Sequence, residues 1–469
     1  MTLSKKIAQN TSVQLIGKTV STLLGLLAVA IMTRALGAAQ FGWYATAVGF
    51  LQFVGIFSDF GFTVTTANLL AEPKFEKNKL LNTIFTWRII TAFFFQGLAP
   101  LLFLFFPYPA PIKTAVFILS ISFFAQALIQ VFVGYLQTQL KMHWQAVGEI
   151  LGRVVLVGGL ALVARFGFGY LPMMWVITAA AVVYAAYMYW RSRPLGFCLD
   201  REITRALFKK MWPTALAVLF NAIYLQGDRV ILPLYATATE VGFYSAAYRV
   251  LDIITQVAAM VMGLLMPLMT FAWSRNLKEE FSVHFQRAFD LTALFLLPMV
   301  AGAIFLATPI MRFVAGAEFS GAGRILQILS LAIIGICFGM VFGHASLAIG
   351  RQKQALWVYI TDAVISFIAY LVFIPKFGPW GAAGVTIFSE FYAGFGLAMV
   401  AGYWSNFIPR LKNFYKILFS SLFMGGVIYY LKLHLLFSIL IGALIYGLLI
   451  LALRVISKQT LQEIFKRSV

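Results

Sequence analysis

The sequence is poor in charged residues and in cysteine, and each shortage excludes a class of protein. Only 11% of its residues are charged and 61% are hydrophobic, whereas a soluble domain carries about 25% charged residues. The two cysteines, Cys198 and Cys337, lie in widely separated segments, which excludes a disulfide framework and a cysteine-based metal site. We therefore predict a membrane protein without a large soluble domain.

The usual signatures of catalysis are also missing. The sequence contains no P-loop and no Asp-x-Asp cluster of the kind that metal-dependent glycosyltransferases carry. Its few histidines are scattered, without a partner at metal-ligand spacing. We expect no catalytic residue, no metal site, no cofactor and no enzymatic activity. A membrane enzyme or an assembly scaffold remains an alternative.

Long apolar runs are what the chain has in abundance. About 14 of them are long enough to cross the hydrocarbon core of a bilayer as helices. Their approximate limits are 12–33, 43–65, 82–106, 113–137, 147–164, 170–190, 211–233, 243–270, 288–308, 324–349, 355–374, 379–403, 414–431 and 435–455. A polar start without a cleavage site precedes the first run, so we expect no removable signal peptide. The predicted fold class is an all-α polytopic membrane protein.

The basic residues that give the chain its formal net charge of +20 are distributed in a way that indicates its membrane topology. If the N-terminus is cytoplasmic, most lysines and arginines fall in cytoplasmic loops, as the positive-inside rule requires. This predicts an even number of spans with both termini in the cytoplasm. We expect membrane lipids as partners and no nucleic acid, and the basic stretch 191–210 is expected to lie against anionic lipid heads.

The chain contains traces of an internal repeat. Residues 31–61 resemble the stretch that begins at Tyr235, so that Gly242 aligns with Gly42 and Tyr244 with Tyr44. A second match joins 140–146 with 350–355. Two six-helix lobes related by a pseudo-two-fold axis along the membrane normal are the simplest interpretation. The predicted divisions are an N-lobe at 1–190, a basic linker at 191–210, a C-lobe at 211–403 and a C-terminal helix pair with a tail at 404–469.

Charged residues within the spans are candidate site residues, because a charge at the bilayer centre costs about 3 kcal/mol on insertion scales. Lys18 continues a polar stripe formed by Asn10, Gln14 and Thr22 at four-residue spacing on the first span. Such a stripe is typical of a helix that lines water or another polar surface. The alternative is that Lys18 snorkels to the cytoplasmic surface.

Two further spans carry a polar face. Gln52 and Asp59 share one side of the second span. On the eighth span Tyr248 and Asp252 share a side, and Arg249 lies three residues from Asp252. Arg249 and Asp252 could line a cavity or form a neutralised structural pair.

The remaining candidates divide into bases and acids. Arg88 could face a cavity or snorkel, Arg153 could pair with Glu149 four residues earlier, and Arg229 could lie at the outer surface. Asp362 and Glu390 lie deeper in their spans. Buried carboxylates of this kind serve as H⁺ or Na⁺ sites in transporters, so coupling to either ion is expected at Asp59, Asp252, Asp362 and Glu390.

The N-terminal motifs resemble those of a known family. The start Asn10-x₆-Gly17-Lys18, the stretch TRALGAAQFGWY at 33–44 and the Ser-Asp-Phe-Gly sequence at 58–61 resemble the polysaccharide flippases. These O-antigen and exopolysaccharide exporters belong to a superfamily that also holds multidrug extruders and the lipid II flippase. The resemblance covers nearly the whole chain and is strongest over 10–65.

The resemblance implies an activity and a place in the cell. It implies that undecaprenyl-pyrophosphate-linked oligosaccharide crosses the bacterial inner membrane by alternating access, with a polysaccharide polymerase as a further partner. Substrate-binding residues would then be Lys18, Arg88, Arg153, Arg229, Arg249, Gln52 and Tyr248. The alternative within this fold is a cation-coupled antiporter of drugs or other small molecules.

Overall fold

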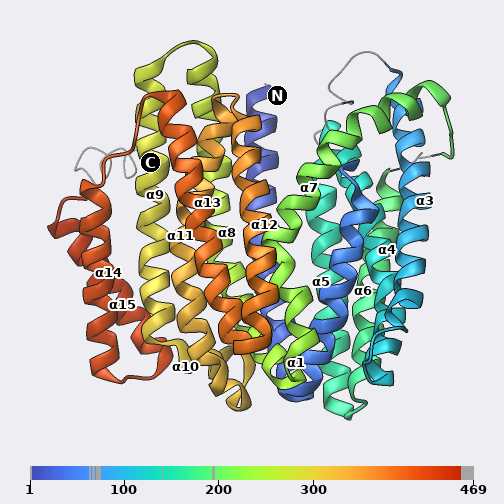
Figure 1. Ribbon diagram of the computed structural model, residues 1–469, viewed down its shortest axis with the longest axis horizontal. Helices are drawn as coiled ribbons and strands as arrows, with labels where there is room; N and C mark the ends of the chain where they lie inside the picture. The colour runs from blue at the N-terminus through green and yellow to red at the C-terminus, as the bar shows by residue number, and fades with distance from the viewer. Residues whose placement is uncertain are drawn as a thin grey trace. The chain divides into compact units, whose positions relative to one another are not determined.

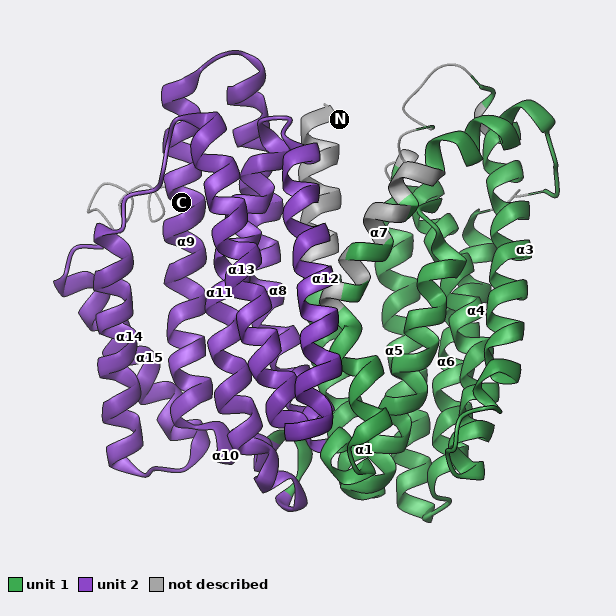
Figure 2. Ribbon diagram, in the orientation of Figure 1, with its two compact units in different colours: residues 1–242, 314–316 green, residues 243–313, 317–469 purple. Residues whose placement is uncertain are grey.

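The computed structural model describes residues 3–62, 65, 69, 75–139, 141–192 and 196–455. Throughout these ranges the regular elements are helices (Figure 1). The chain divides into two compact units (Figure 2): unit 1 comprises residues 1–242 and 314–316, and unit 2 comprises residues 243–313 and 317–469. Each unit is described separately below.

The described residues of unit 1 form six helices in chain order. They are α1 (Leu3–Asp59), α3 (Lys77–Phe103), α4 (Ala110–Thr138), α5 (Met142–Phe166), α6 (Tyr170–Ser192) and α7 (Arg201–Tyr235). The next helix, α8 (Ala238–Ser274), starts in unit 1 and continues in unit 2.

Unit 2 continues with α8 and holds most of the chain that follows. Its elements are α9 (Lys278–Phe305), α10 (Ala307–Ala315), the 3₁₀ helix η1 (Ala317–Gly321), α11 (Ala322–Ala348), α12 (Gln352–Phe377), α13 (Pro379–Ser405), α14 (Lys412–Leu431) and α15 (Leu435–Ala452).

The helices confirm the predicted fold class, since every predicted apolar run falls on one of them. Within the described residues, 12 helices are long and apolar enough to cross a membrane. Helix α1 counts once among them although it holds the first two predicted runs, which a sharp bend at Gly37 (φ 69°, ψ 178°) separates. A positive φ of this size strains residues with a Cβ, so glycine suits the bend. Helix α7, which holds the seventh predicted run, is not among these 12 helices. The protein is a multi-pass membrane protein.

The segments that the sequence repeat aligned meet in unit 1. A Cβ built on Gly42 would overlap the carbonyl oxygen of Ala238, and a Cβ built on Gly242 would overlap that of Ala38. Each glycine therefore lets one backbone approach the other, in a reciprocal contact. Only glycine permits so close an approach.

The loop before α7 is bound to α3. Asn82 Oδ1 accepts a hydrogen bond from the Gly196 amide at 2.9 Å, and Thr86 Oγ1 accepts one from the Cys198 amide at 3.0 Å. Lys79 Nζ lies 2.7 Å from a carboxylate oxygen of Asp200. Trp87 donates from Nε1 to Thr204 Oγ1 at 3.0 Å. Part of the predicted linker, residues 196–204, is thus fastened along one helix, while the lobe limits expected from the sequence stay a prediction.

Aromatic side chains fill the cores of both units. In unit 1, Phe85 and Phe132 pack at 5.5 Å between ring centroids, among buried leucines and methionines of α3, α4 and α7. In unit 2, Phe285 and Phe289 of α9 pack against Phe342 of α11.

Candidate functional site

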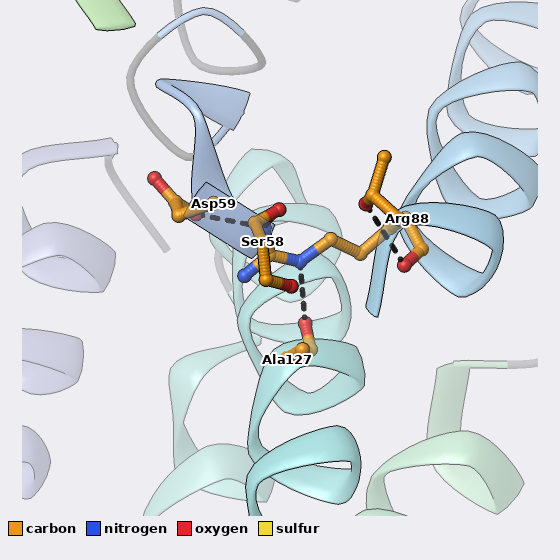
Figure 3. A network of polar contacts seen from close by, with 5 residues as sticks. Ser58, Asp59, Arg88 and Ala127 are labelled. Carbon is orange, nitrogen blue, oxygen red and sulfur yellow. Dashed lines mark hydrogen bonds and ion pairs between the residues drawn. The ribbon is translucent and has the colours of Figure 1, made fainter. Parts of the chain in front are cut away.

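A buried ion pair joins α1 and α3 in unit 1. Arg88 Nη1 lies 3.0 Å from Asp59 Oδ1 and donates to the carbonyl oxygen of Ser58 at 2.9 Å. Arg88 Nε donates to the carbonyl oxygen of Ala127 on α4 at 3.2 Å. Figure 3 shows the arginine extending from α3 to these partners. One guanidinium group thereby connects three helices.

The two members of this pair differ in exposure. Arg88 is 4% exposed, whereas the side chain of Asp59 is 22% exposed. A buried charge is tolerated only when it is paired and hydrogen-bonded, and the end of α1 supplies both kinds of partner. Protein acceptors therefore hold the guanidinium through Nη1 and Nε, and the carboxylate is the more exposed member of the pair.

A second cluster lies in unit 2, around Asp362 on α12. Asp362 is fully buried, and its carboxylate accepts hydrogen bonds from Ser366 Oγ at 2.8 Å and from Ser389 Oγ of α13 at 3.0 Å. Both partners are neutral hydroxyls. Among the described residues no lysine or arginine pairs with this carboxylate. An ionised group in such a place needs a compensating cation or a proton.

Further hydroxyls extend this cluster along α12 and α13. Thr386 Oγ1 lies 3.1 Å from the hydroxyl of Tyr370 and 3.5 Å from that of Tyr244 on α8. Glu390 follows Ser389 and is also buried. A carboxylate beside several hydroxyl oxygens provides the oxygen ligands that hard cations prefer.

Sequence reasoning identified the two carboxylates but missed the hydroxyls around them. Asp362, Ser366 and Tyr370 follow one another at four-residue spacing on α12, which places them on one face of the helix. This four-residue spacing was the sequence signal that could have identified the hydroxyl groups on α12. The partner positions Thr386 and Ser389 on α13 become apparent only when the two helices are packed.

Helix α8 contains the pair anticipated from its spacing. Arg249 Nη1 lies 3.8 Å from Asp252 Oδ2, and their side chains are 36% and 40% exposed. Tyr248 is buried, with its ring 5.3 Å from that of Tyr244. The pair is loose and accessible, which distinguishes it from the tight Arg88–Asp59 pair.

The other predicted site residues lie on unit 1 helices. Lys18 is exposed, and its carbonyl oxygen accepts a hydrogen bond from Thr22 Oγ1 at 2.8 Å. Arg153 lies beside Gly25, with its Nη1 3.6 Å from where a Cβ would be. The side chains of Asn10 and Gln14 lie outside the described residues, so the stripe they form with Lys18 stays a prediction.

Gln52 and Arg229 lie on helices that pack together. Gln52 is half-buried on α1. The backbone carbonyl oxygen of Arg229 on α7 lies 2.9 Å from where a Cβ of Gly49 would be. The Arg229 amide donates to the carboxylate of buried Asp228 at 2.8 Å. The structure thus brings together Arg88 with Asp59, Arg249 with Asp252, and Asp362 with the neighbour of Glu390.

No group of three or more His, Cys, Asp or Glu side chains that could hold a metal ion occurs in the described part of the chain. Many membrane-crossing helices with a buried ion pair and a buried carboxylate define the class: a polytopic membrane protein of transporter type. Its fold is that of a solved lipid II flippase, MurJ, in an inward closed conformation. The two structures align with a TM-score of 0.77 and 20% identity, over 92% of this chain and 97% of the other.

The family follows from the sequence. The chain belongs to the polysaccharide biosynthesis protein family, whose model matches residues 7–273. It is 24% identical over 342 residues to Agl15 of Haloferax volcanii, a probable low-salt glycan biosynthesis flippase, covering 70% of this chain and 71% of that protein. It is 26% identical over 347 residues to ExoT of Rhizobium meliloti, a succinoglycan biosynthesis transport protein, covering 70% of this chain and 66% of that one. These matches confirm the resemblance seen in the motifs.

Proposed function

We propose that this protein is a flippase that carries undecaprenyl-pyrophosphate-linked oligosaccharide from the cytoplasmic to the outer leaflet of a bacterial inner membrane. The observation that carries the proposal is the family match over more than half of the chain, together with flippase relatives in both sequence and fold. The protein acts as a transporter, without a catalytic step of its own. Both termini face the cytoplasm, and a polysaccharide polymerase uses the product.

The pyrophosphate is bound by basic side chains in this proposal. Lys18 and Arg249 are accessible, and both cations can contact phosphate, the arginine through a bidentate fork. Arg88 is bonded to three protein acceptors, so it binds substrate only if Asp59 releases it. Arg153, Arg229, Gln52 and Tyr248 complete the proposed path for the substrate.

Ion coupling rests on the carboxylates. Asp362 is enclosed by neutral hydroxyl donors, and an H⁺ or Na⁺ at this position removes the cost of a buried negative charge. Glu390, Asp59 and Asp252 are the other proposed coupling residues. Uptake of the ion neutralises the cluster, and its release drives the return of the empty transporter.

The test is complementation of a strain that lacks the gene. Surface polysaccharide and accumulated lipid-linked oligosaccharide are measured for the wild-type chain, Lys18→Ala and Arg249→Ala, at matched protein levels. We expect both variants to lose surface polymer and to accumulate the lipid-linked precursor. Normal export by a Lys18→Ala/Arg249→Ala double variant would contradict the proposed phosphate contacts.

A small-molecule antiporter is the second candidate, and the buried Asp362 cluster is the observation that favours it. An antiporter of this kind needs carboxylates more than bases. If deletion of the gene leaves surface polysaccharide unchanged but sensitises cells to cationic drugs, and Asp362→Asn does the same, the antiporter replaces the flippase.

A further inference from the structure

At one end of the α5–α6 pair, an arginine of one helix stacks on a tryptophan of the other. Arg191, in the last turn of α6, has its guanidinium carbon 3.7 Å from the ring centroid of Trp144 in the first turn of α5. The same carbon lies 4.2 Å from the ring of Trp190 and 5.8 Å from that of Tyr187. Three aromatic rings thus surround one cation.

The α12–α13 pair of unit 2 repeats the arrangement with the roles exchanged. Arg351, at the N-cap of α12, lies 3.4 Å from the ring of Trp404 in the last turn of α13. In unit 1 the arginine ends the second helix, and in unit 2 it begins the first. The chain therefore places an Arg–Trp pair at the same junction of two helix pairs from different sequences, which indicates a common requirement at that position.

Neither arginine has an acidic partner. Among the described residues no carboxylate forms an ion pair with Arg191 or Arg351, and the sequence contains no Asp or Glu at 166–199 or 322–361. The buried Nε of Arg191 has no hydrogen-bond acceptor in the described structure. Stacking on an aromatic face orients the guanidinium but uses none of its in-plane N–H donors. Each pair thus presents an oriented cation whose donors lack an anion.

The position of the two Arg–Trp pairs indicates which kind of anion lies near them. Both pairs lie at the ends of membrane-crossing helices, and Trp190 and Trp404 are exposed there. Tryptophan at such a place is typical of the level of the lipid headgroups. The charge distribution of the loops predicts that these ends face the cytoplasm, where anionic lipids concentrate.

We propose that Arg191 with Trp144, and Arg351 with Trp404, are two binding sites for the phosphate of an anionic membrane phospholipid. The aromatic rings orient each guanidinium, and its terminal Nη groups form charge-assisted hydrogen bonds with the phosphate oxygens. The two sites anchor the α5–α6 and α12–α13 pairs to the headgroup layer. This inference requires only that the protein spans a membrane, and it does not depend on the transported substrate.

The test is native mass spectrometry of the full-length protein in detergent with added lipid. We expect wild type to retain two molecules of phosphatidylglycerol at a concentration where phosphatidylcholine with the same acyl chains is not retained. Arg191→Gln and Arg351→Gln should each lose one bound lipid, with affinity for that site about tenfold weaker or more. The double variant should retain neither lipid.

Controls separate headgroup binding from other causes. Arg165→Gln, at the opposite end of α5, should keep both lipids. Free glycerol phosphate and inorganic phosphate distinguish a lipid from a soluble anion, and a site that either occupies as well as the lipid contradicts the proposal. Equal retention of phosphatidylcholine by wild type would overturn it without any variant. So would full retention of phosphatidylglycerol by the double variant, which would leave the Arg–Trp pairs as contacts between helices only.

Discussion

The Arg88 guanidinium is a full charge enclosed by α1, α3 and α4, and its partners determine what it can do. Asp59 neutralises it, and the carbonyl groups of Ser58 and Ala127 accept hydrogen bonds from its Nη1 and Nε. The sequence indicated both charged residues but not their pairing, because 28 positions separate them and only packing brings them together. The Arg249–Asp252 pair was anticipated, since three-residue spacing on one helix suffices to predict it.

Arg88→Ala should destabilise the protein by about 3 kcal/mol, because it removes the cation that pairs with the largely buried Asp59 carboxylate. The double variant Arg88→Ala/Asp59→Ala should be less destabilised than the sum of the two single variants. Thermal unfolding in detergent, followed for all four proteins, measures this. Additive losses would show that the pair contributes no coupling energy.

Asp362→Asn tests the carboxylate at the centre of the unit 2 cluster. Asparagine has nearly the same shape and retains one oxygen to accept from Ser366 or Ser389, so the fold should persist. It cannot take up a proton or balance a cation, so export should fall to the level of the deletion strain. Ser366→Ala is the matched control and should keep most of the activity. Wild-type export by Asp362→Asn would exclude a coupling role for this group.

At the scale of the elements, the apolar runs predicted the helices well because a span must be long and continuous. The ends of helices could be predicted less well where individual hydrogen bonds and ion pairs determine them. The sequence placed the start of the seventh run at 211, whereas α7 begins at Arg201. The Asp200 side chain caps that start by accepting from the Ile203 amide at 2.8 Å, and α3 holds the loop before it. A hydropathy pattern carries no information on such polar contacts.

Gly42→Ala should disrupt the crossing of the two repeated segments. Its methyl group would overlap the carbonyl oxygen of Ala238, so the backbones must separate, at a cost of about 1–3 kcal/mol. Gly158→Ala on α5 is the control, since a Cβ there meets nothing within 4 Å. The thermal midpoint should fall for the first variant and stay or rise for the second. Equal midpoints would contradict the close approach.

The ionisation of Asp200 makes the stability of the loop before α7 depend on pH. Its pKa lies below the ordinary value of 3.8 because the carboxylate accepts from the Ile203 amide and pairs with Lys79. Because the pKa of Asp200 is lower in the folded state than in the unfolded state, its ionised carboxylate stabilises the fold at a pH above the unfolded pKa. This stabilisation is lost as the pH falls through the pKa of the folded state. Asp200→Ala should therefore lower the thermal midpoint at neutral pH but not in strong acid.

Asp200→Asn separates the two contributions at this position. Asparagine is also a good N-cap, so this variant should lose only the ion pair with Lys79 and fall between wild type and Asp200→Ala. The thermal midpoint is measured as a function of pH for the three proteins. A difference between wild type and Asp200→Ala that persists unchanged in strong acid would contradict the assignment.

At the scale of the whole molecule, the distribution of positive charge predicts which side each loop faces. Cys198, which is partly exposed in the loop before α7, provides a natural probe. A membrane-impermeant maleimide should label it only after the cells are permeabilised. Lys113→Cys in a Cys198→Ala background, on the predicted outer side, should be labelled in intact cells. The reverse pattern would invert the topology and place the phospholipid sites in the opposite leaflet.

The central claim is translocation of a lipid-linked oligosaccharide, and reconstitution tests it most directly. The purified protein is placed in vesicles with an undecaprenyl-pyrophosphate-linked oligosaccharide, and the fraction of oligosaccharide accessible to an added glycosidase is followed over time. The account predicts that wild type moves substrate between leaflets, and that Lys18→Ala/Arg249→Ala and Asp362→Asn leave the accessible fraction at the protein-free level. A wild-type protein that is folded, oriented and supplied with an ion gradient, yet leaves that fraction unchanged, would contradict it.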